Sequence, residues 1–192
     1  QDQVGNLEVL KATTVIVDAS APNSAFSIGA PSYTDGDGTR YITPTSPISF
    51  SAQDPALPGG TAGSDVDRIE VAVDGGAFAP YLSALTFAEG RHTILFRAFD
   101  RVGNVEATQS LALRSDASAP QTSMAAVAGR QAPGPDAATM YASGDSLFAF
   151  PASDPMAGEV ASGVDFTRWR DGTGAFQTYS VPVSLAEGAH QL

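Results

Sequence analysis

The stretch RHTILFRAFDRVGNVE, residues 91–106, decides the fold. Side chains alternate between the two faces of a strand, so Ile94, Phe96 and Ala98 share one apolar face. Val102-Gly103-Asn104 follows, and Gly and Asn supply the positive φ values that a tight turn needs. The stretch is therefore predicted to form a β-strand, a tight turn and the start of a second strand.

Parts of this stretch recur at both ends of the sequence. Residues 2–8 are almost a copy of residues 100–106, and residues 189–192 align with residues 91–94. Between them, identical residues recur at a spacing of 98 or 100, as in Asp18/Asp116, Pro22/Pro120, Tyr41/Tyr141, Phe50/Phe150, Asp54/Asp154, Asp67/Asp165, Tyr81/Tyr179 and His92/His190. So many matches in one register indicate a tandem repeat.

The repeat predicts three parts. Residues 1–19 are the last strand of a preceding repeat, residues 20–117 form a complete domain, and residues 118–192 form a second domain that lacks its final strands. Since the sequence starts inside a repeat, we expect a fragment whose targeting segment, if it has one, lies outside it.

Composition narrows the function classes. The net charge is −11, and an acidic surface disfavours nucleic acid and anionic membranes as partners. The absence of cysteine excludes a disulfide framework, a thiolate metal site and a cysteine nucleophile. No apolar segment is long enough to suggest membrane insertion.

Short apolar segments separated by turn residues predict the fold class. Residues 46–53, 69–73, 85–87 and 111–113 read as further short strands, and no stretch keeps a helical period over ten residues. About seven short strands in a repeat of roughly 100 residues is typical of an immunoglobulin-like sandwich. We therefore predict an all-β chain of tandem immunoglobulin-like β-sandwich domains.

Several motifs resemble a known family. They are DVDRI at 65–69, VDGGAF at 73–78, EGRHTI at 89–94, RAFDRVGNVE at 97–106 and the linker DASAP at 116–120. Together they resemble the tandem immunoglobulin-like repeats of large bacterial secreted and cell-surface proteins. The resemblance implies an extracellular or cell-surface location in a bacterium, and a role as a stalk, an adhesin module or an enzyme appendage.

Recurring carboxylates are the candidate metal ligands. Ca²⁺ takes six to eight oxygen ligands, and loops at the strand ends are expected to gather several at one pole of a domain. The candidates are Asp54, Asp67, Asp100, Glu106, Asp154 and Asp165, and Ca²⁺ is the expected ion. The alternative is that Asp54 and Asp100 accept backbone N–H groups in turns. Asp18 and Asp116 lie just before the Ala-Pro linkers; we expect them to cap the last strand, and binding of a linker ion is the alternative.

No motif predicts catalysis. His92 and His190 occupy one repeat position after Glu-Gly, so we expect both to be structural. Asp35-Gly36-Asp37-Gly38 resembles part of a Ca²⁺ loop, but a hairpin tip explains it better. The sequence contains no nucleophile elbow, zinc-protease motif or phosphate loop, so it is not expected to be an enzyme.

Two functions remain open. The first is a non-catalytic structural or adhesive module, a unit of a stalk or filament, whose partners are neighbouring repeats of the same chain or of another copy. The second is a carbohydrate- or protein-binding accessory domain of a secreted enzyme, with a glycan or surface protein as partner. The second would expose aromatics, yet most of the tyrosines match between repeats and are expected to be core or corner residues.

The ends of the sequence suggest a mode of assembly. The second domain stops in mid-strand at Leu192, whereas residues 4–17 are a last strand without a domain. Head-to-tail strand complementation between copies would join the two. The alternative, which we prefer, is that the sequence is an excerpt of a longer array.

Overall fold

The computed structural model describes residues 3–9 and 11–192, and their regular structure consists entirely of β-strands. No helix occurs among these residues, which confirms the all-β prediction. The strands up to Ser115 are β1 Asn23–Ile28, β2 Ser32–Thr34, β3 Arg40–Ile42, β4 Ile48–Gln53, β5 Val66–Val73, β6 Ala79–Pro80, β7 Gly90–Asp100 and β8 Gln109–Ser115. Among the described residues, no helix has the length and apolar character needed to cross a membrane.

Later strands are shorter. They are β9 Gln121–Thr122, β10 Ala125–Ala128, β11 Gln131–Pro133, β12 Met140–Ala142, β13 Leu147–Ala149, β14 Ala152–Ser153, β15 Arg168–Trp169, β16 Gln177–Thr178 and β17 Val183–Ser184. They make one three-stranded sheet, β10-β13-β17, and the two-stranded sheets β11-β12, β14-β9 and β15-β16.

Contacts divide the chain into two units. Unit 1 consists of Gln1–Ser27, Ile48–Ala84 and Thr93–Leu111, and unit 2 of Ile28–Pro47, Leu85–His92 and Ala112–Leu192. These units follow spatial contacts and not the sequence repeat, so the predicted division at residues 19 and 117 stays a prediction.

The largest sheet has six strands in the order β2-β3-β8-β7-β5-β6. It is mixed, because β3 pairs with β8 in parallel while β5 pairs with both β7 and β6 antiparallel. A separate two-stranded sheet consists of β1 and β4.

Strand β7 has the predicted alternation. Ile94, Phe96 and Ala98 are buried, while the residues between them are half-buried. The β5–β7 register places Val71 opposite Phe96 and Ile69 opposite Ala98, so these apolar faces coincide. Residues 85–87, predicted as a strand, have an isolated bridge at Leu85 but form no strand, although Phe87 is buried.

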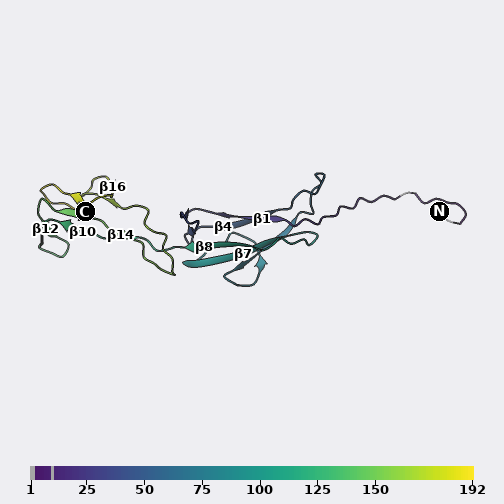
Figure 1. Ribbon diagram of the computed structural model, residues 1–192, viewed down its shortest axis with the longest axis horizontal. Helices are drawn as coiled ribbons and strands as arrows, with labels where there is room; N and C mark the ends of the chain where they lie inside the picture. Colours follow the sequence, from purple (N-terminus) through teal and green to yellow (C-terminus); the bar gives the residue numbers. More distant parts are fainter. Residues whose placement is uncertain (1–2, 10) are drawn as a thin grey trace. The chain divides into compact units, whose positions relative to one another are not determined.

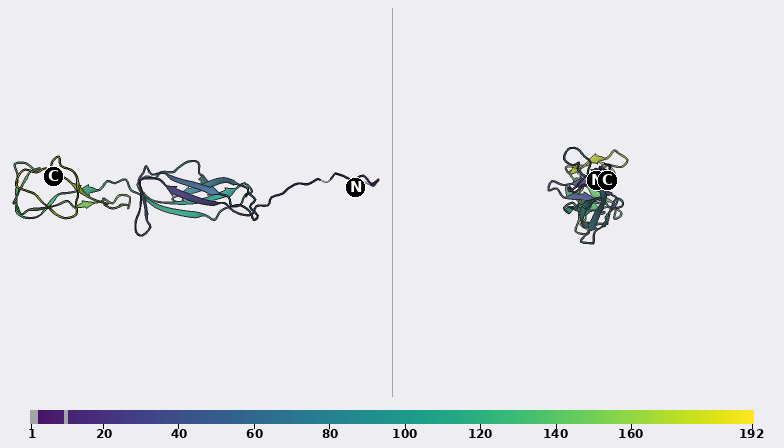
Figure 2. Two further views of the ribbon diagram at one scale, coloured as in Figure 1. Left: turned by 90° about the horizontal axis from the view of Figure 1, so that it is seen from above. Right: turned by 90° about the vertical axis from the view of Figure 1, so that its right-hand side faces the viewer.

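Aromatic contacts join the β1–β4 sheet to β7 within unit 1. Phe96 is 1% exposed, and its ring centroid lies 6.1 Å from that of Phe26 in β1 and 4.9 Å from that of Phe50 in β4. Figures 1 and 2 show the purple-to-blue β1 and β4 running alongside the teal β7. Phe96 is therefore the centre of this core.

The same aromatic pair recurs in unit 2. Phe150 and Tyr179 meet edge to face with ring centroids 5.4 Å apart, as Phe50 and Tyr81 do at 5.3 Å in unit 1. Trp169 stacks on Phe150 at 5.8 Å. The recurrence of one local geometry at repeat-related positions agrees with the repeat in the sequence.

The hairpin after β7 differs from expectation in one respect. Gly103 has φ +95°, and its N–H donates to the carbonyl oxygen of Asp100, as a tight turn requires. The second strand, however, starts only at Gln109. Before it, Phe99 and Val105 form an isolated antiparallel bridge, and the Glu106 N–H donates to the Ala98 carbonyl oxygen at 3.0 Å. The Ala98 N–H in turn donates to the Glu106 carboxylate at 3.1 Å.

Residues 11–22 form no strand, and Val15, Ile16 and Val17 are exposed. The prediction that residues 1–19 are the last strand of a preceding repeat stays a prediction. Asp2, the counterpart of Asp100 in that prediction, lies outside the described residues.

Candidate metal centre

Three aspartates meet in unit 1. Asp54 follows directly after β4, Asp100 is the last residue of β7, and Asp18 precedes β1. One carboxylate oxygen from each lies within 4.8 Å of the other two. We call Asp18, Asp54 and Asp100 the aspartate cluster.

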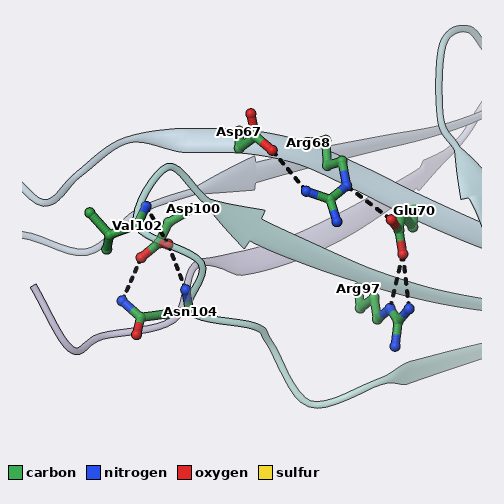
Figure 3. Close-up of polar contacts among 7 residues, drawn as sticks. All are labelled: Asp67, Arg68, Glu70, Arg97, Asp100, Val102 and Asn104. Atoms are coloured by element: carbon green, nitrogen blue, oxygen red, sulfur yellow. Dashed lines mark hydrogen bonds and ion pairs between the residues drawn. The ribbon is translucent and has the colours of Figure 1, made fainter.

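Asp100 is the most buried member, at 2% exposure. Asn104 Nδ2 donates to Oδ2 at 2.6 Å, and the Asn104 amide N–H donates to Oδ1 at 2.7 Å. The amide N–H of Val102 also donates to Oδ1, at 3.1 Å (Figure 3). The predicted alternative, an aspartate that accepts turn N–H groups, therefore applies to this residue as well.

Burial and hydrogen bonding oppose each other at Asp100. Burial raises the pKa of the carboxyl group. The hydrogen bonds that the carboxylate accepts, the two from Asn104 foremost, together lower the pKa by more than burial raises it, so the pKa lies below its ordinary value of 3.8. Asp100 is therefore an anion at neutral pH.

Asp18 ties the segment before β1 to the strand ends. Its Oδ1 accepts the Ser20 N–H at 3.0 Å, and its Oδ2 accepts the Ser64 N–H at 2.6 Å. These backbone bonds lower the pKa of Asp18, while burial and the negative charge of Asp100 oppose them. Asn104 Nδ2 lies 3.3 Å from the Asp18 carbonyl oxygen and holds the same segment.

Asp54 is the incompletely satisfied member. Its Oδ2 accepts the Asp65 N–H at 2.7 Å, but its Oδ1 is buried without a hydrogen-bond partner. The nearby Ser64 Oγ is also buried, and its hydroxyl lies close enough to Asp18 and Asp100 to lower the pKa of both. A Cβ at Gly63 would lie 2.6 Å from Asp54 Oδ2, so the loop closes tightly around this carboxylate. An unpaired buried carboxylate oxygen is unfavourable, and a cation would satisfy it.

The chemistry of the cluster suits a hard cation. Asp18 and Asp100 are anionic and repel each other at this separation. None of the three forms an ion pair with a lysine or arginine in the described part of the chain; the closest in sequence, Arg101, pairs with Asp65 at 3.1 Å on the surface. Carboxylate oxygens are the ligands that Ca²⁺ prefers, with water and backbone carbonyls completing its shell.

The other sequence candidates lie elsewhere. Asp67 is exposed and pairs with Arg68 at 2.8 Å (Figure 3). Glu106 accepts the Ser24 N–H at 2.8 Å and the Ala98 N–H at 3.1 Å, and it also accepts from the Ser24 hydroxyl and the Gln109 amide. The structure thus brings together Asp54 and Asp100, but neither Asp67 nor Glu106 joins them.

In unit 2 the two remaining candidates differ. Asp165 is exposed. Asp154 accepts the Gly163 N–H at 2.7 Å through Oδ2, and its Oδ1 is buried without a partner, as in Asp54. Asp116 accepts the Ser118 N–H at 3.0 Å and the Ser162 N–H at 2.7 Å, repeating the bonds of Asp18.

Asp18 is the member of the cluster for which the sequence favoured capping, with a linker ion as the alternative. Its recurrence as Asp116 before the second Ala-Pro linker was the available signal. The loop that contains Ser64 folds back and places Asp18 beside Asp54, and the sequence alone does not predict this fold-back.

Both histidines bind back to their own turn. His190 Nε2 lies 2.8 Å from the Ala186 carbonyl oxygen, and His92 Nε2 lies 3.0 Å from that of Ala88. His190 Nδ1 also lies 2.6 Å from Asp171 Oδ2. These contacts agree with the structural role expected for the two histidines.

The His190–Asp171 pair predicts a pH dependence. The hydrogen bond to Asp171 raises the pKa of His190 above 6.5, and the same bond lowers the pKa of Asp171 below 3.8. The histidine contribution to stability is therefore full below about pH 6.5 and lost as pH rises through the folded pKa. The aspartate contribution is present above about pH 3.8 and lost as pH falls through its folded pKa.

We expect His190→Gln to lower the melting temperature more at about pH 5.5 than at about pH 9. Thermal unfolding followed by circular dichroism at both pH values measures this. Asp171→Asn is the matched variant and should show the same difference. An equal effect of His190→Gln at both pH values would contradict the assignment of an ionised pair.

Comparisons with known proteins identify no relative. No protein-family model, no curated protein and no solved structure matches the chain. The likeness to bacterial immunoglobulin-like repeats therefore remains an expectation based on sequence motifs.

Proposed function

We propose that this chain is a non-catalytic structural module of a bacterial extracellular or surface protein, built from tandem immunoglobulin-like sandwich repeats. The sandwich is supported by the contacts of Phe26 and Phe50, from the β1–β4 sheet, with Phe96 in the six-stranded sheet. The tandem arrangement is supported by the Phe50–Tyr81 geometry that recurs as Phe150–Tyr179.

We also propose that the aspartate cluster binds Ca²⁺. The observation that carries this proposal is the buried Asp54 Oδ1 without a partner, beside the anionic Asp18 and Asp100. Each residue has a distinct part. Asp100 lies at the end of β7, Asp54 lies directly after β4, and Asp18 lies in the segment that precedes β1. A bound cation would neutralise the three carboxylates and fix that segment to both strand ends.

The side-chain contacts on the outer face of β5 and β7 favour a structural role over glycan binding. Arg68 lies 3.8 Å from the ring centroid of Phe99, and Arg97 lies 4.1 Å from that of Phe78. Figure 3 shows both arginines held by Glu70, and the Arg97–Glu70 distance is 2.9 Å. Sugar rings stack on open aromatic faces, whereas guanidinium groups lie over these two rings.

Calcium titration by isothermal calorimetry tests the proposal. We expect one site in the aspartate cluster with a Kd of about 0.1–1 mM, the range of extracellular calcium modules. Asp54→Asn is expected to weaken binding about tenfold or more, because it removes the carboxylate with the unsatisfied oxygen.

The control is Asp67→Asn, since Asp67 was a sequence candidate but lies outside the cluster on the protein surface. It should bind calcium like the parent chain. Equal affinities for Asp54→Asn and the parent chain would refute the assignment of the site.

A further inference from the structure

Two arginines of the β15–β16 hairpin lie over phenylalanine rings. The guanidinium carbon of Arg168 lies 4.6 Å from the ring centroid of Phe166, and that of Arg170 lies 4.7 Å from the ring centroid of Phe176. Side chains alternate along a strand, so residues 166, 168 and 170 share one face, while Trp169 lies on the other and stacks in the core. We call Phe166, Arg168, Arg170 and Phe176 the arginine patch.

The sequence differs at the same positions 98 residues earlier. The residues RWR at 168–170 stand where the first copy has EVA at 70–72, whereas residues 174–176 still match residues 76–78. The second copy therefore keeps the hairpin and changes the side chains on this face from a mixed set to a cationic one.

In the first copy, one carboxylate neutralises the arginines of this face. Glu70 lies between Arg68 and Arg97, each with a nitrogen 2.9 Å from a Glu70 carboxylate oxygen (Figure 3). In the second copy, Arg168 occupies the position of that glutamate. Neither Arg168 nor Arg170 forms an ion pair with any residue that the structure describes. The arginine patch therefore lacks the carboxylate that its counterpart contains.

The acidic residues next in sequence do not replace it. Asp165 and Asp171 alternate with the patch residues and therefore belong to the opposite face of the strand. Asp171 Oδ2 also lies 2.6 Å from His190 Nδ1, so this carboxylate already has a partner. The patch is thus a local cationic surface on a chain of net charge −11.

Aromatic rings of the patch are more open than those of the first copy. Phe166 is 54% exposed and Phe176 is 60% exposed, whereas Phe78 and Phe99 are half-buried. A guanidinium group covers one side of each ring of the patch, and the remaining ring surface faces solvent. Such a surface can pack against the apolar C–H groups of a sugar ring.

We propose that the arginine patch binds a carboxylated polysaccharide, a chain of uronic acid sugars. A sugar carboxylate accepts hydrogen bonds from Arg168 and Arg170, as Glu70 does from two arginines in the first copy. The sugar ring packs against the open surface of Phe166 or Phe176. An acidic peptide fits less well, because peptides pair with the edge of a sheet and the patch is the face of a hairpin.

The two arginines also suit a polymer that presents several carboxylates. They lie about 7 Å apart along the strand, since each residue adds about 3.4 Å. Neighbouring sugars can therefore each offer a carboxylate to one arginine. None of these residues belongs to the aspartate cluster, so the inference stands apart from the calcium proposal.

Calorimetric titration of the full chain with oligomers of galacturonic acid tests the inference, in EDTA because uronates themselves bind calcium. We expect binding at about 50 mM salt that weakens as the salt concentration rises. Arg168→Gln and Arg170→Gln should each raise the Kd about tenfold, because each removes charge-assisted hydrogen bonds. The matched control is Arg130→Gln, which removes an exposed arginine outside the patch and should leave the Kd within about twofold. No binding by the parent chain, or equal losses in all three variants, would overturn the inference.

Two further ligands test the chemistry of the partner. The methyl ester of the same oligomer keeps the sugar rings but has no charge, and it should not bind. Polyglutamate offers carboxylates on a peptide and should bind about tenfold more weakly than the uronate. Equal binding of the methyl ester would overturn recognition of a carboxylate, and equal or tighter binding of polyglutamate would assign the patch to an acidic protein segment instead.

Phe176→Ala separates ring packing from charge. It keeps both arginines and should weaken uronate binding about threefold or more, because the sugar loses apolar contact. Polyglutamate binding should not change. Thermal unfolding checks that each variant stays folded, as expected for exposed side chains. An unchanged Kd for the uronate would contradict the packing of a sugar ring on the patch.

Discussion

Phe96→Ala is expected to lower the free energy of unfolding by about 3–5 kcal/mol, the largest effect of any single change considered for this chain. Phe96 is 1% exposed and contacts Phe26 and Phe50, so alanine would leave a cavity between two sheets. Neighbouring rings cannot fill that space without leaving their own rotamers. Urea unfolding followed by circular dichroism measures the loss.

The matched control is Phe176→Ala in unit 2. Phe176 is 60% exposed, so its removal should change stability by less than about 0.5 kcal/mol. If both variants lost the same amount, Phe96 would not be the centre of the core.

Glu106→Ala is expected to destabilise the chain by about 3 kcal/mol. The Glu106 carboxylate accepts from the backbone N–H groups of Ser24 and Ala98 and from the Ser24 hydroxyl and Gln109 amide. It thereby joins β1 to β7. Removing it leaves the Ser24 and Ala98 N–H groups without an acceptor in a region where both residues are buried.

The sequence itself supplies the control. Glu8 occupies the same repeat position as Glu106, but its side chain is 72% exposed and pairs with Lys11 at 2.7 Å. Glu8→Ala should therefore be nearly neutral, within about 0.5 kcal/mol. Chemical denaturation of both variants measures the difference, and comparable losses would contradict a specific role for Glu106.

The β-structure was predictable because its signals are local. Alternating apolar residues in 94–99 and the Gly103-Asn104 turn are enough to place β7 and the turn that ends it. The interruption between the Phe99–Val105 bridge and the start of β8 at Gln109 was not predictable, because the Glu106 carboxylate bonds to the Ala98 N–H and to Ser24, contacts that are not local in the sequence. Residues 85–87 show the converse limit: Phe87 is apolar and buried, but burial alone does not produce a strand.

The aspartate cluster was predictable only in part. Recurrence selected Asp54 and Asp100, but it equally selected Asp67 and Glu106, because all four repeat. Separating them requires the directions in which their strands place each side chain. Glu106 lies against Ser24, Asp67 faces solvent beside Arg68, and only Asp54 and Asp100 reach Asp18.

Thermal unfolding with and without calcium tests the central claim most directly. A ligand that binds only the folded chain raises its stability by mass action. In about 10 mM CaCl₂ we therefore expect a melting temperature at least roughly 5 °C above that in EDTA, with most of the rise absent in Asp54→Asn. Identical melting temperatures of the parent chain in calcium and in EDTA would contradict the claim that the aspartate cluster is a structural cation site.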